Sequence, residues 1–492
     1  MSTATAPGRL TTTVGRRTQR LVYGRPTPEE IGRELALTST VDRAHLVMLT
    51  ERGLVGPEDA AALLARIERL RAEQFAPLHH APTPRGLYLA YENHLIAHLG
   101  AEVGGRLHTG RSRNDLKATV QAMDLRTTLA GLGGELVRLQ AVLLARARAH
   151  RDVLMPVHTH YQAALPITYG YYLAGIALAL GRDITALDDA ARGLDRCPMG
   201  AAAAAGSELP IDPARVAGLL GFAGPARHAL DAVASRDTAL RALAAAAGAA
   251  LTVSRLGTDL QLWSTTEFGF VTFPDRLVGG SSAMPQKRNA FLLEHVKARA
   301  ATAIGAWTTA ASMTRSTPFT NSIEVGTEAI GATGPGLRAV ADTVQLAQSL
   351  VLGARPVPER MLRRAQEGFV GATALANLLV GEGVPFRTAH RDVGDAVRRA
   401  VERGDTRLTR ADLPPELADT ELSLTFLTMR QRAGGPGDFD AVFADALADC
   451  RAHADRAARR RAALATAGAA LDEAVAARLT RRPAPAAGGA RR

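Results

Sequence analysis

Residues 279–289 read Gly-Gly-Ser-Ser-Ala-Met-Pro-Gln-Lys-Arg-Asn, and this short stretch decides how the rest of the chain is interpreted. Two hydroxyl side chains, Ser281 and Ser282, directly follow two glycines, and Lys287 and Asn289 come within the next seven residues. Glycine gives a loop access to backbone conformations that other residues avoid. A nearby lysine lowers the pKa of a hydroxyl or stabilises a carboxylate that gains charge. A bare Gly-Gly-Ser-Ser is more often a solvated loop, but the complete string is far more specific.

Two further stretches support a functional interpretation of this loop. Residues 108–116 read His-Thr-Gly-Arg-Ser-Arg-Asn-Asp-Leu, and residues 158–168 read His-Thr-His-Tyr-Gln-Ala-Ala-Leu-Pro-Ile-Thr. Together the three stretches resemble the signatures of the fumarase/aspartase superfamily, in the version found in argininosuccinate lyases. Members of this superfamily eliminate fumarate from substituted succinates. We call the stretches the first signature (108–116), the second signature (158–168) and the signature loop (279–289). Weaker similarities extend the resemblance over residues 20–437, in the order and at the spacing of the family.

The sequence predicts an all-α fold. Apolar residues recur at helical spacing over residues 115–150, 166–195, 229–265 and 289–312, and proline and glycine gather between these stretches. Short strands are expected only near residues 270–274. The resemblance implies a fumarase/aspartase-like three-domain subunit whose long central bundle joins a tetramer with a twenty-helix core. The expected divisions are a disordered N-terminus (1–20), a small N-terminal helical domain (21–107), a central helical-bundle domain (108–357), a C-terminal helical domain (358–437), and an Ala/Arg-rich extension of one or two helices with a tail (438–492).

Composition excludes several classes of protein. A chain of 492 residues is too long for one compact core, and 47% hydrophobic with 22% charged residues is ordinary for a globular protein. The two cysteines, Cys197 and Cys450, cannot form a disulfide framework and fit a reducing cytoplasm. No run of eighteen apolar residues, secretory signal or cluster of metal ligands is evident, so neither a membrane span nor a metal is expected.

The net charge of +11 is carried by the two ends of the chain. Residues 1–26 have a net charge of +5 and residues 451–492 have +7, which leaves −1 for residues 27–450. Neither end interleaves aromatic residues with its arginines, as a binder of single-stranded nucleic acid would. We interpret the ends as solvated, disordered tails and expect no nucleic-acid partner.

The resemblance assigns catalytic roles to five residues. Ser281 is the base that takes the Cβ proton of the succinyl group, and Lys287 and Asn289 stabilise the resulting aci-carboxylate. His160 transfers a proton or supplies charge near the departing nitrogen, and Glu294 is paired with it. An unperturbed serine is too weak a base, so the loop must close over Ser281 and exclude water. No metal or organic cofactor is implied, because the elimination needs only bases and donors to anions.

Substrate-binding roles follow from the same resemblance. The expected residues are Ser112, Asn114 and Thr159 as donors to carboxylates, Arg113 completing the first signature, Gln162 at the other end of the substrate, and Ser282 and Met284 in the loop. The structural alternative for residues 111–115 is a capped helix start, and both interpretations can hold because a helix N-terminus attracts anions. Alone, His160 would be an ordinary loop or core histidine and Glu294 a surface carboxylate.

The departures from the family concern the substrate. Residues 315–329 lack the tyrosine, glutamine and lysine that hold the arginine and carboxylate parts of argininosuccinate. Residues 86–91 replace an Asp-Ile-His-type element, His228 replaces an asparagine, and Ala290 replaces a proline. Removing a polar group that a buried site uses to hold its substrate costs roughly 1–3 kcal/mol, enough to change substrate preference.

The sequence therefore predicts a carbon–nitrogen lyase that cleaves an N-substituted aspartate to fumarate and an amine by reversible anti β-elimination. Three alternatives stay open: a paralogue with another amine, such as an aminopolycarboxylate or an intermediate of specialised metabolism; argininosuccinate lyase itself; and a non-catalytic protein on the same fold. Glu324 or Glu328 would favour a cationic amine. The expected assembly is a cytoplasmic homotetramer with shared active sites and a small-molecule substrate. The leaving amine, the physiological direction and the role of residues 438–492 stay undetermined.

Overall fold

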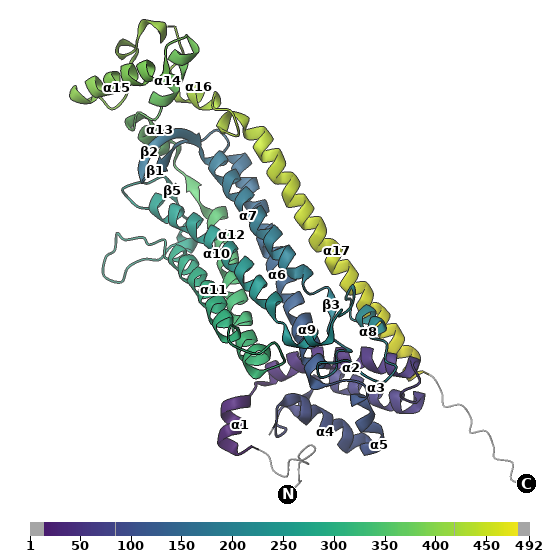
Figure 1. The fold of residues 1–492 in the computed structure, drawn as a ribbon. Helices are drawn as coiled ribbons and strands as arrows, with labels where there is room; N and C mark the ends of the chain where they lie inside the picture. Colours follow the sequence, from purple (N-terminus) through teal and green to yellow (C-terminus); the bar gives the residue numbers. More distant parts are fainter. Residues whose placement is uncertain (1–13, 84, 418, 481–492) are drawn as a thin grey trace, which may run out of the picture.

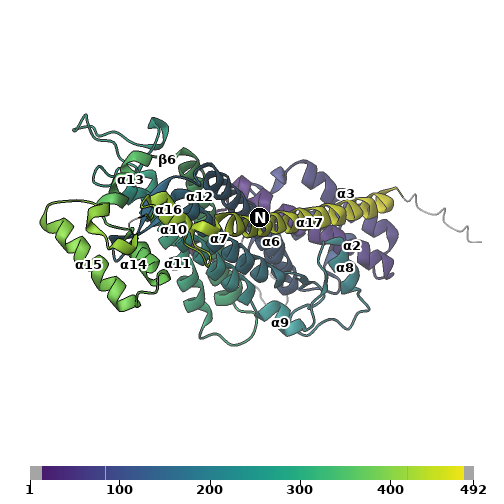
Figure 2. The same cartoon turned by 90° about the horizontal axis from the view of Figure 1, so that it is seen from above.

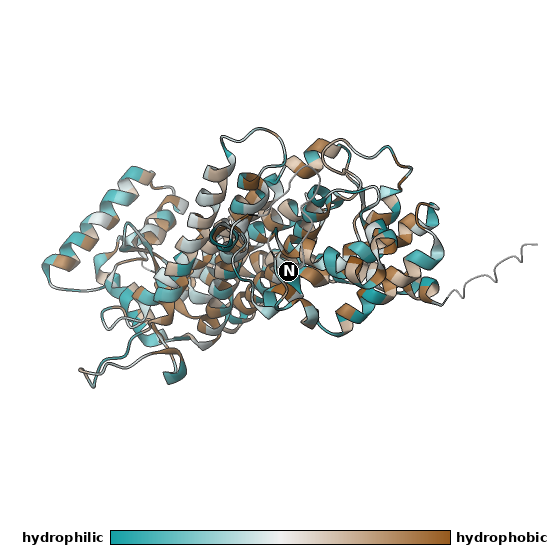
Figure 3. Ribbon diagram, turned by 90° about the horizontal axis from the view of Figure 1, so that it is seen from below, coloured by the Kyte–Doolittle hydropathy of each residue, from teal (hydrophilic) through white to brown (hydrophobic). Residues whose placement is uncertain are grey.

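The computed structural model describes residues 14–83, 85–417 and 419–480. Long helices run side by side along one axis, with a small helical region at each end (Figure 1). The predicted all-α class with a long central bundle is confirmed. In Figure 3, apolar and polar residues alternate along these helices, as expected for amphipathic helices that pack against one another.

The N-terminal region packs around α2. The Thr27 side chain accepts a hydrogen bond from the Glu30 amide, Glu30 accepts one from the Thr27 amide, and Pro28 occupies the first helical turn. This capping box fixes the start of a helix that buries Leu35 and Leu46. The elements are α1 (Arg16–Tyr23), α2 (Pro28–Glu51), α3 (Pro57–Ala72), η1 (Ala76–Leu78), α4 (Leu87–Leu99), α5 (Ala101–Gly104) and η2 (Gly105–His108).

Helix α1 corrects part of the prediction for the N-terminus. Residues 16–20, predicted to be disordered, belong to α1, although this helix buries no residue. Its end contacts α4, because the Tyr23 ring lies 3.6 Å from the position that a Cβ would take on Gly86. Residues 1–13 lie outside the described residues.

Five helices form the central bundle: α6 (Arg113–Ala149), α7 (Tyr169–Arg192), α10 (Asp237–Trp263), α11 (Leu292–Thr314) and α12 (Thr333–Gly353). Wholly buried alanines such as Ala246, Ala249 and Ala250 let neighbouring helices approach closely. Helices α6 and α10 are apolar enough, by length and composition alone, to span a membrane. Because both pack inside this bundle, we interpret them as core helices.

Short strands and turns connect the bundle helices. Strand β1 (Leu154–Thr159) pairs antiparallel with β2 (Gln162–Thr168), β3 (Arg196–Cys197) pairs parallel with β4 (Gly224–Pro225), and β5 (Val271–Thr272) pairs antiparallel with β6 (Arg355–Pro356). The expected strand near residues 270–274 is present, but residues 166–168, predicted as helix, belong to β2. The remaining connectors are α8 (Pro213–Leu219), α9 (Ala229–Ala234), η3 (Asp275–Leu277) and the π-helix η4 (Glu324–Ala329).

The far end of the bundle carries a separate small core built on Leu375, Leu379, Ala389 and Leu427. Its elements are α13 (Pro358–Glu367), α14 (Ala372–Gly381), α15 (Phe386–Glu402), η5 (Arg410–Asp412), η6 (Pro415–Leu417), α16 (Leu424–Met429) and η7 (Pro436–Asp438).

Helix α17 (Phe439–Leu479) then returns along the whole bundle to the N-terminal region (Figures 1 and 2). Arg456 and Arg460 pair with Asp188 of α7 at 3.1 and 2.7 Å, and Leu471 packs into the N-terminal core. The interpretation of residues 451–492 as a solvated tail is therefore wrong for residues 451–479. Residues 481–492 lie outside the described residues.

Candidate active site

The signature loop is closed at its base and exposed at its tip. The amides and carbonyls of Gly279 and Asn289 exchange two hydrogen bonds of 2.8 Å. Arg288 anchors the base through Asp275 at 2.5 Å and through the Phe273 carbonyl at 3.1 Å. Between these fixed ends, residues 280–288 project from the side of the bundle between η3 and α11 (Figure 1).

Within the loop, the Ser281 hydroxyl accepts hydrogen bonds from the amides of Ala283 and Met284 at 3.3 and 3.1 Å. The side chains of Ser282, Met284 and Lys287 are exposed. In this structure the half-buried Ser281 hydroxyl therefore contacts the backbone of its own loop.

The glycines at the start of the loop serve a different purpose from the one predicted. Neither Gly279 nor Gly280 has a positive φ. Gly279 is required instead by close approach, because a Cβ there would lie 3.1 Å from the ring of Phe291.

The second signature forms the β1–β2 hairpin, and His160 and Tyr161 are the two central residues of its turn. Their φ angles are 50° and 61°, values that non-glycine residues adopt at a cost in energy. Such strain is frequent at functional sites. Thr159 pairs with Gln162 across the turn, and all four of these residues are exposed.

The other histidine of this signature is structural. The His158 ring packs edge-on against Phe268 with centroids 5.6 Å apart. Burial and the charge of Arg364 lower its pKa. Only His160 is therefore presented for contact with a substrate.

The first signature begins helix α6. The Ser112 hydroxyl accepts a hydrogen bond from the Asn114 amide at 3.2 Å, and Asp115 accepts one from the Ser112 amide at 3.0 Å. The wholly buried Asp115 also accepts from the amides of Gly200 and Ala202. The predicted helix cap is therefore present. Arg113 is exposed at the same helix end.

A largely buried network of hydrogen bonds supports the first signature. Arg111 donates to Asp42 at 2.6 Å and to the Tyr88 hydroxyl at 3.0 Å. The same hydroxyl donates to Glu92 at 3.1 Å and lies 3.1 Å from Nδ1 of His108. Burial raises the pKa of Glu92, but hydrogen bonds from His108 and Tyr88 outweigh it and leave the pKa below its ordinary value. Tyr88, from the divergent segment 86–91, is thus part of the support of the first signature.

One of the two other departures from the family has a local explanation. His228 is the N-cap of α9, where its Nδ1 accepts a hydrogen bond from the Asp231 amide at 3.3 Å, the role that an asparagine would fill. Nothing in the structure explains Ala290, because the hydrogen bond that its carbonyl accepts from the Leu293 amide at 3.1 Å would also form with proline.

One subunit does not bring the signatures together. Helix α6 has 37 residues, so the first signature and the hairpin that follows its far end are about 55 Å apart at 1.5 Å per residue. Figure 1 shows the start of α6 beside α2 and the hairpin at the opposite end of the bundle. Within the described residues, Glu294 accepts a hydrogen bond from Gln261 at 3.4 Å, and no ion pair joins it to His160.

The divergent segment 315–329 lies against α6 directly beyond the first signature. The Lys117 ammonium donates to the Thr327 hydroxyl at 2.5 Å, and the Gln121 amide donates to the Gly326 carbonyl at 2.7 Å. Gln121 also accepts from Nε of Arg236 at 3.1 Å. Both contacts are to η4, a π-helix, and such insertions are often found at functional sites.

Lys117, Gln121 and Arg236 were not among the predicted site residues. One signal in the sequence could have identified Lys117, because it is one of only three lysines in a chain with 59 lysines and arginines. Lys287, in the signature loop, is another of these three lysines.

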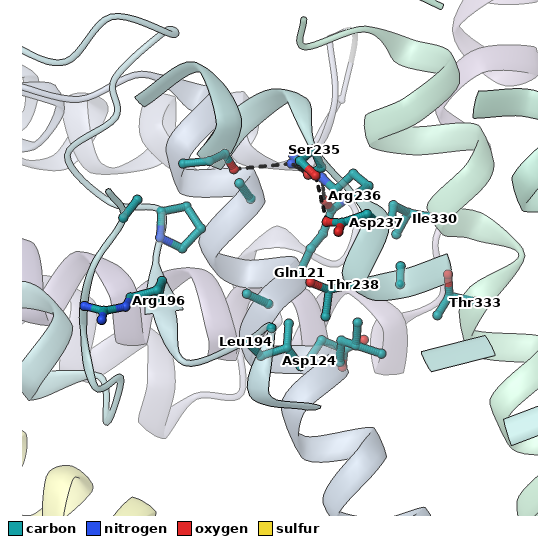
Figure 4. Close-up of a pocket in the computed structure, with 18 of the residues that line it drawn as sticks. Gln121, Asp124, Leu194, Arg196, Ser235, Arg236, Asp237, Thr238, Ile330 and Thr333 are labelled. Atoms are coloured by element: carbon teal, nitrogen blue, oxygen red, sulfur yellow. Dashed lines mark hydrogen bonds between the residues drawn. The ribbon is translucent and has the colours of Figure 1, made fainter. Parts of the chain in front are cut away.

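A cavity of about 290 Å³ opens beside these residues (Figure 4). It lies between α6, α9 and the first turns of α10 and α12, and Gln121 and Arg236 form part of its wall. Polar groups from several elements line the rest, including Asp124, Arg196, Asp237 and Thr333.

The helical bundle and its three separated signatures define a fumarase-type lyase. A lyase family model matches residues 81–305, and an argininosuccinate lyase C-terminal model matches residues 369–425. The argininosuccinate lyase of Methanothrix thermoacetophila is 36% identical over 412 residues, covering 80% of this chain and 83% of the relative. That of Thermus thermophilus is 38% identical, covering 74% and 79%.

Among solved structures, EDDS lyase in complex with formate matches with a TM-score of 0.82 and 27% identity, covering 95% of this chain and 97% of that chain. The chain belongs to the argininosuccinate lyase branch of the fumarase/aspartase superfamily. It is a carbon–nitrogen lyase that releases fumarate.

Proposed function

We propose that this enzyme cleaves an N-substituted aspartate other than argininosuccinate to fumarate and an amine, by reversible anti β-elimination. The supporting observation is the segment 315–329, which lacks the expected tyrosine, glutamine and lysine and contacts α6 beside the first signature through Gly326 and Thr327. The similarity to EDDS lyase over nearly the whole chain also supports a substrate outside arginine metabolism.

In the proposed reaction, Ser281 takes the Cβ proton of the bound substrate, and the electron pair moves into the adjacent carboxylate. Lys287 and Asn289 stabilise the aci-carboxylate that forms. When that intermediate collapses, the C–N bond breaks and the nitrogen leaves with a proton supplied near His160, whose partner is Glu294. Ser112, Asn114 and Thr159 hold the succinyl carboxylates.

The assembly that this mechanism needs is a homotetramer. Because about 55 Å of α6 separates the first and second signatures, a complete site requires signatures from different subunits. Large apolar side chains on α10, α11 and α12 are also exposed in the single subunit, as surfaces that associate are. They include Leu251, Leu262, Ile304, Trp307 and Leu352. A cytoplasmic location fits the two free cysteines, both of which are buried.

Argininosuccinate lyase itself is the second candidate, because relatives with that name are 36–38% identical over most of the chain. The decisive experiment measures fumarate release from argininosuccinate beside a panel of other N-substituted aspartates, and amine addition to fumarate in reverse. We expect the enzyme to release fumarate from another N-substituted aspartate and not from argininosuccinate. Fast turnover of argininosuccinate would overturn the proposal.

A Ser281→Ala variant supplies the catalytic control for this experiment. Loss of a general base lowers the rate by roughly 100- to 10,000-fold. Ser281 is on an exposed loop, so the variant should unfold at the same temperature as the wild type. If the wild type released fumarate from none of the substrates, a non-catalytic protein would be favoured, although all five expected catalytic residues are present.

A further inference from the structure

Lys117 on α6 lies one helical turn beyond Asn114, the residue expected to hold a succinyl carboxylate. Asn114, Lys117 and Gln121 follow one another at spacings of three and four, so they share one face of the helix. Side chains at this spacing have Cβ atoms about 5–6 Å apart. A substrate whose carboxylate is held at Asn114 would therefore have the Lys117 ammonium within reach.

A second cation borders the same place. Arg236 contacts Gln121 through Nε, and its Nη1 donates to the Ser235 carbonyl at 2.7 Å. Its Nη2 is buried without a hydrogen-bond partner and lies 4.0 Å from the position that a Cβ would take on Gly326. A buried guanidinium nitrogen with a free donor is costly unless an anion accepts from it.

The charges around Lys117 are mixed. Partial burial and the charge of Arg236 lower the pKa of Lys117, and they outweigh Glu34 of α2 and Glu328 of η4, which raise it. The charge of Glu328 is thus opposed by a nearby lysine. Glu324 is fully exposed, and its carboxylate accepts hydrogen bonds from its own backbone amide and from the Ser322 side chain. Two cations and two carboxylates therefore surround this place, so the expected preference for a cationic amine stays a prediction.

The choice of lysine at this position is also informative. The chain has 59 lysines and arginines but only three lysines, and an arginine would satisfy an ordinary surface ion pair equally well. A lysine supplies a compact charge that one carboxylate can approach.

Building on the proposed function, we propose that Lys117 is a specificity-determining residue that, with Arg236, binds a carboxylate on the departing amine. The amine product is accordingly an amino acid or another aminocarboxylate, and its remaining chain extends toward the cavity beside Gln121 and Arg236. Lys117 takes over in this way the role of the lysine that the segment 315–329 lacks.

The test compares amino acids with their decarboxylated amines in the addition to fumarate. The pairs are arginine with agmatine, lysine with cadaverine, and 2,3-diaminopropionate with ethylenediamine, followed by the loss of fumarate absorbance. We expect wild type to favour the amino acid in each pair that reacts. Lys117→Met should raise the KM for the amino acid about 10- to 100-fold, as expected when a charged hydrogen bond is removed, and leave the KM for fumarate unchanged.

Two controls separate recognition from structural damage. Lys117→Arg keeps the charge and should retain most of the preference. Arg138→Met removes an exposed cation from the same helix, 21 residues away, and should change nothing. Equal loss with both members of a pair in Lys117→Met, or a wild-type preference for the decarboxylated amine, would overturn the inference and leave the proposed function standing. If no amine added to fumarate and no N-substituted aspartate released fumarate, both the inference on Lys117 and the proposed function would be overturned.

Discussion

At the scale of single residues, the support behind the first signature depends on groups that sequence analysis does not connect. Arg111 and Asp42 form a wholly buried ion pair although they are 69 positions apart, and His45 donates from Nε2 to the Thr109 carbonyl at 2.8 Å. Removing one partner of such a pair leaves an uncompensated buried charge. The motif residues themselves could be predicted, because their order and spacing are local properties of the chain.

His45 makes the stability of this region depend on pH. Burial and the charge of Arg111 lower its pKa from 6.5 to about 3. Between these two values the unfolded chain binds a proton that the folded protein does not. The stabilisation is therefore complete above pH 6.5 and is lost as the pH falls from 6.5 toward 3. We expect this group alone to cost about 2 kcal/mol between pH 7.5 and pH 5.

The measurement compares wild type with His45→Gln, which keeps a donor for Thr109 but cannot titrate. Denaturant unfolding at pH 7.5 and pH 5 gives the free energy of unfolding of each protein. The wild type should lose more stability than the variant on acidification, since all other groups are shared. Equal losses would show that His45 does not titrate differently in the folded and unfolded states.

At the scale of elements, helices were predicted well and the hairpin was not. Long amphipathic stretches carry a repeated signal: the predicted range 115–150 agrees with α6 within two residues, whereas the predicted range 229–265 is divided into α9 and α10. The β1–β2 hairpin contains Pro156 opposite Pro166, which weakens any strand pattern. The helix over α17 was predicted, but its arginines were expected to be solvated, because their partner Asp188 lies 268 and 272 positions away and meets them only in the folded protein.

The turn of this hairpin offers a test of stored strain. Tyr161 has a φ of 61° and its side chain is 86% exposed, so few contacts compensate for its conformation. Glycine adopts this conformation without steric cost. We expect Tyr161→Gly to raise the free energy of unfolding by roughly 0.5–1 kcal/mol, and Tyr161→Val to lower it, because branched side chains tolerate positive φ least. Thermal unfolding of both variants beside wild type measures the difference, and a destabilised glycine variant would contradict it.

At the scale of the whole molecule, the geometry of one subunit determines how a complete site must form. The signature loop projects from the side of the bundle, the hairpin lies at one end and the first signature at the other (Figure 1). Their exposed residues have no partners from the other signatures within the described chain. A closed oligomer with repeated interfaces, such as the proposed homotetramer, would supply the missing signatures to every site. In the proposed homotetramer, side chains of other subunits would complete the site, so the sequence of one chain could predict the expected members but not their arrangement.

This arrangement predicts complementation between two inactive variants. Ser281→Ala damages only the loop, and His160→Asn damages only the hairpin. If a site takes its loop and its hairpin from different subunits, random mixing in tetramers should restore about one quarter of the sites. The matched control mixes Ser281→Ala with Lys287→Met. Both changes are in the loop, so every site then contains a damaged loop and no activity should return. The assay is fumarate formation by co-expressed, differently tagged subunits purified as mixed oligomers. Equal activity in the two mixtures, or none in either, would show that the signatures do not meet across subunits.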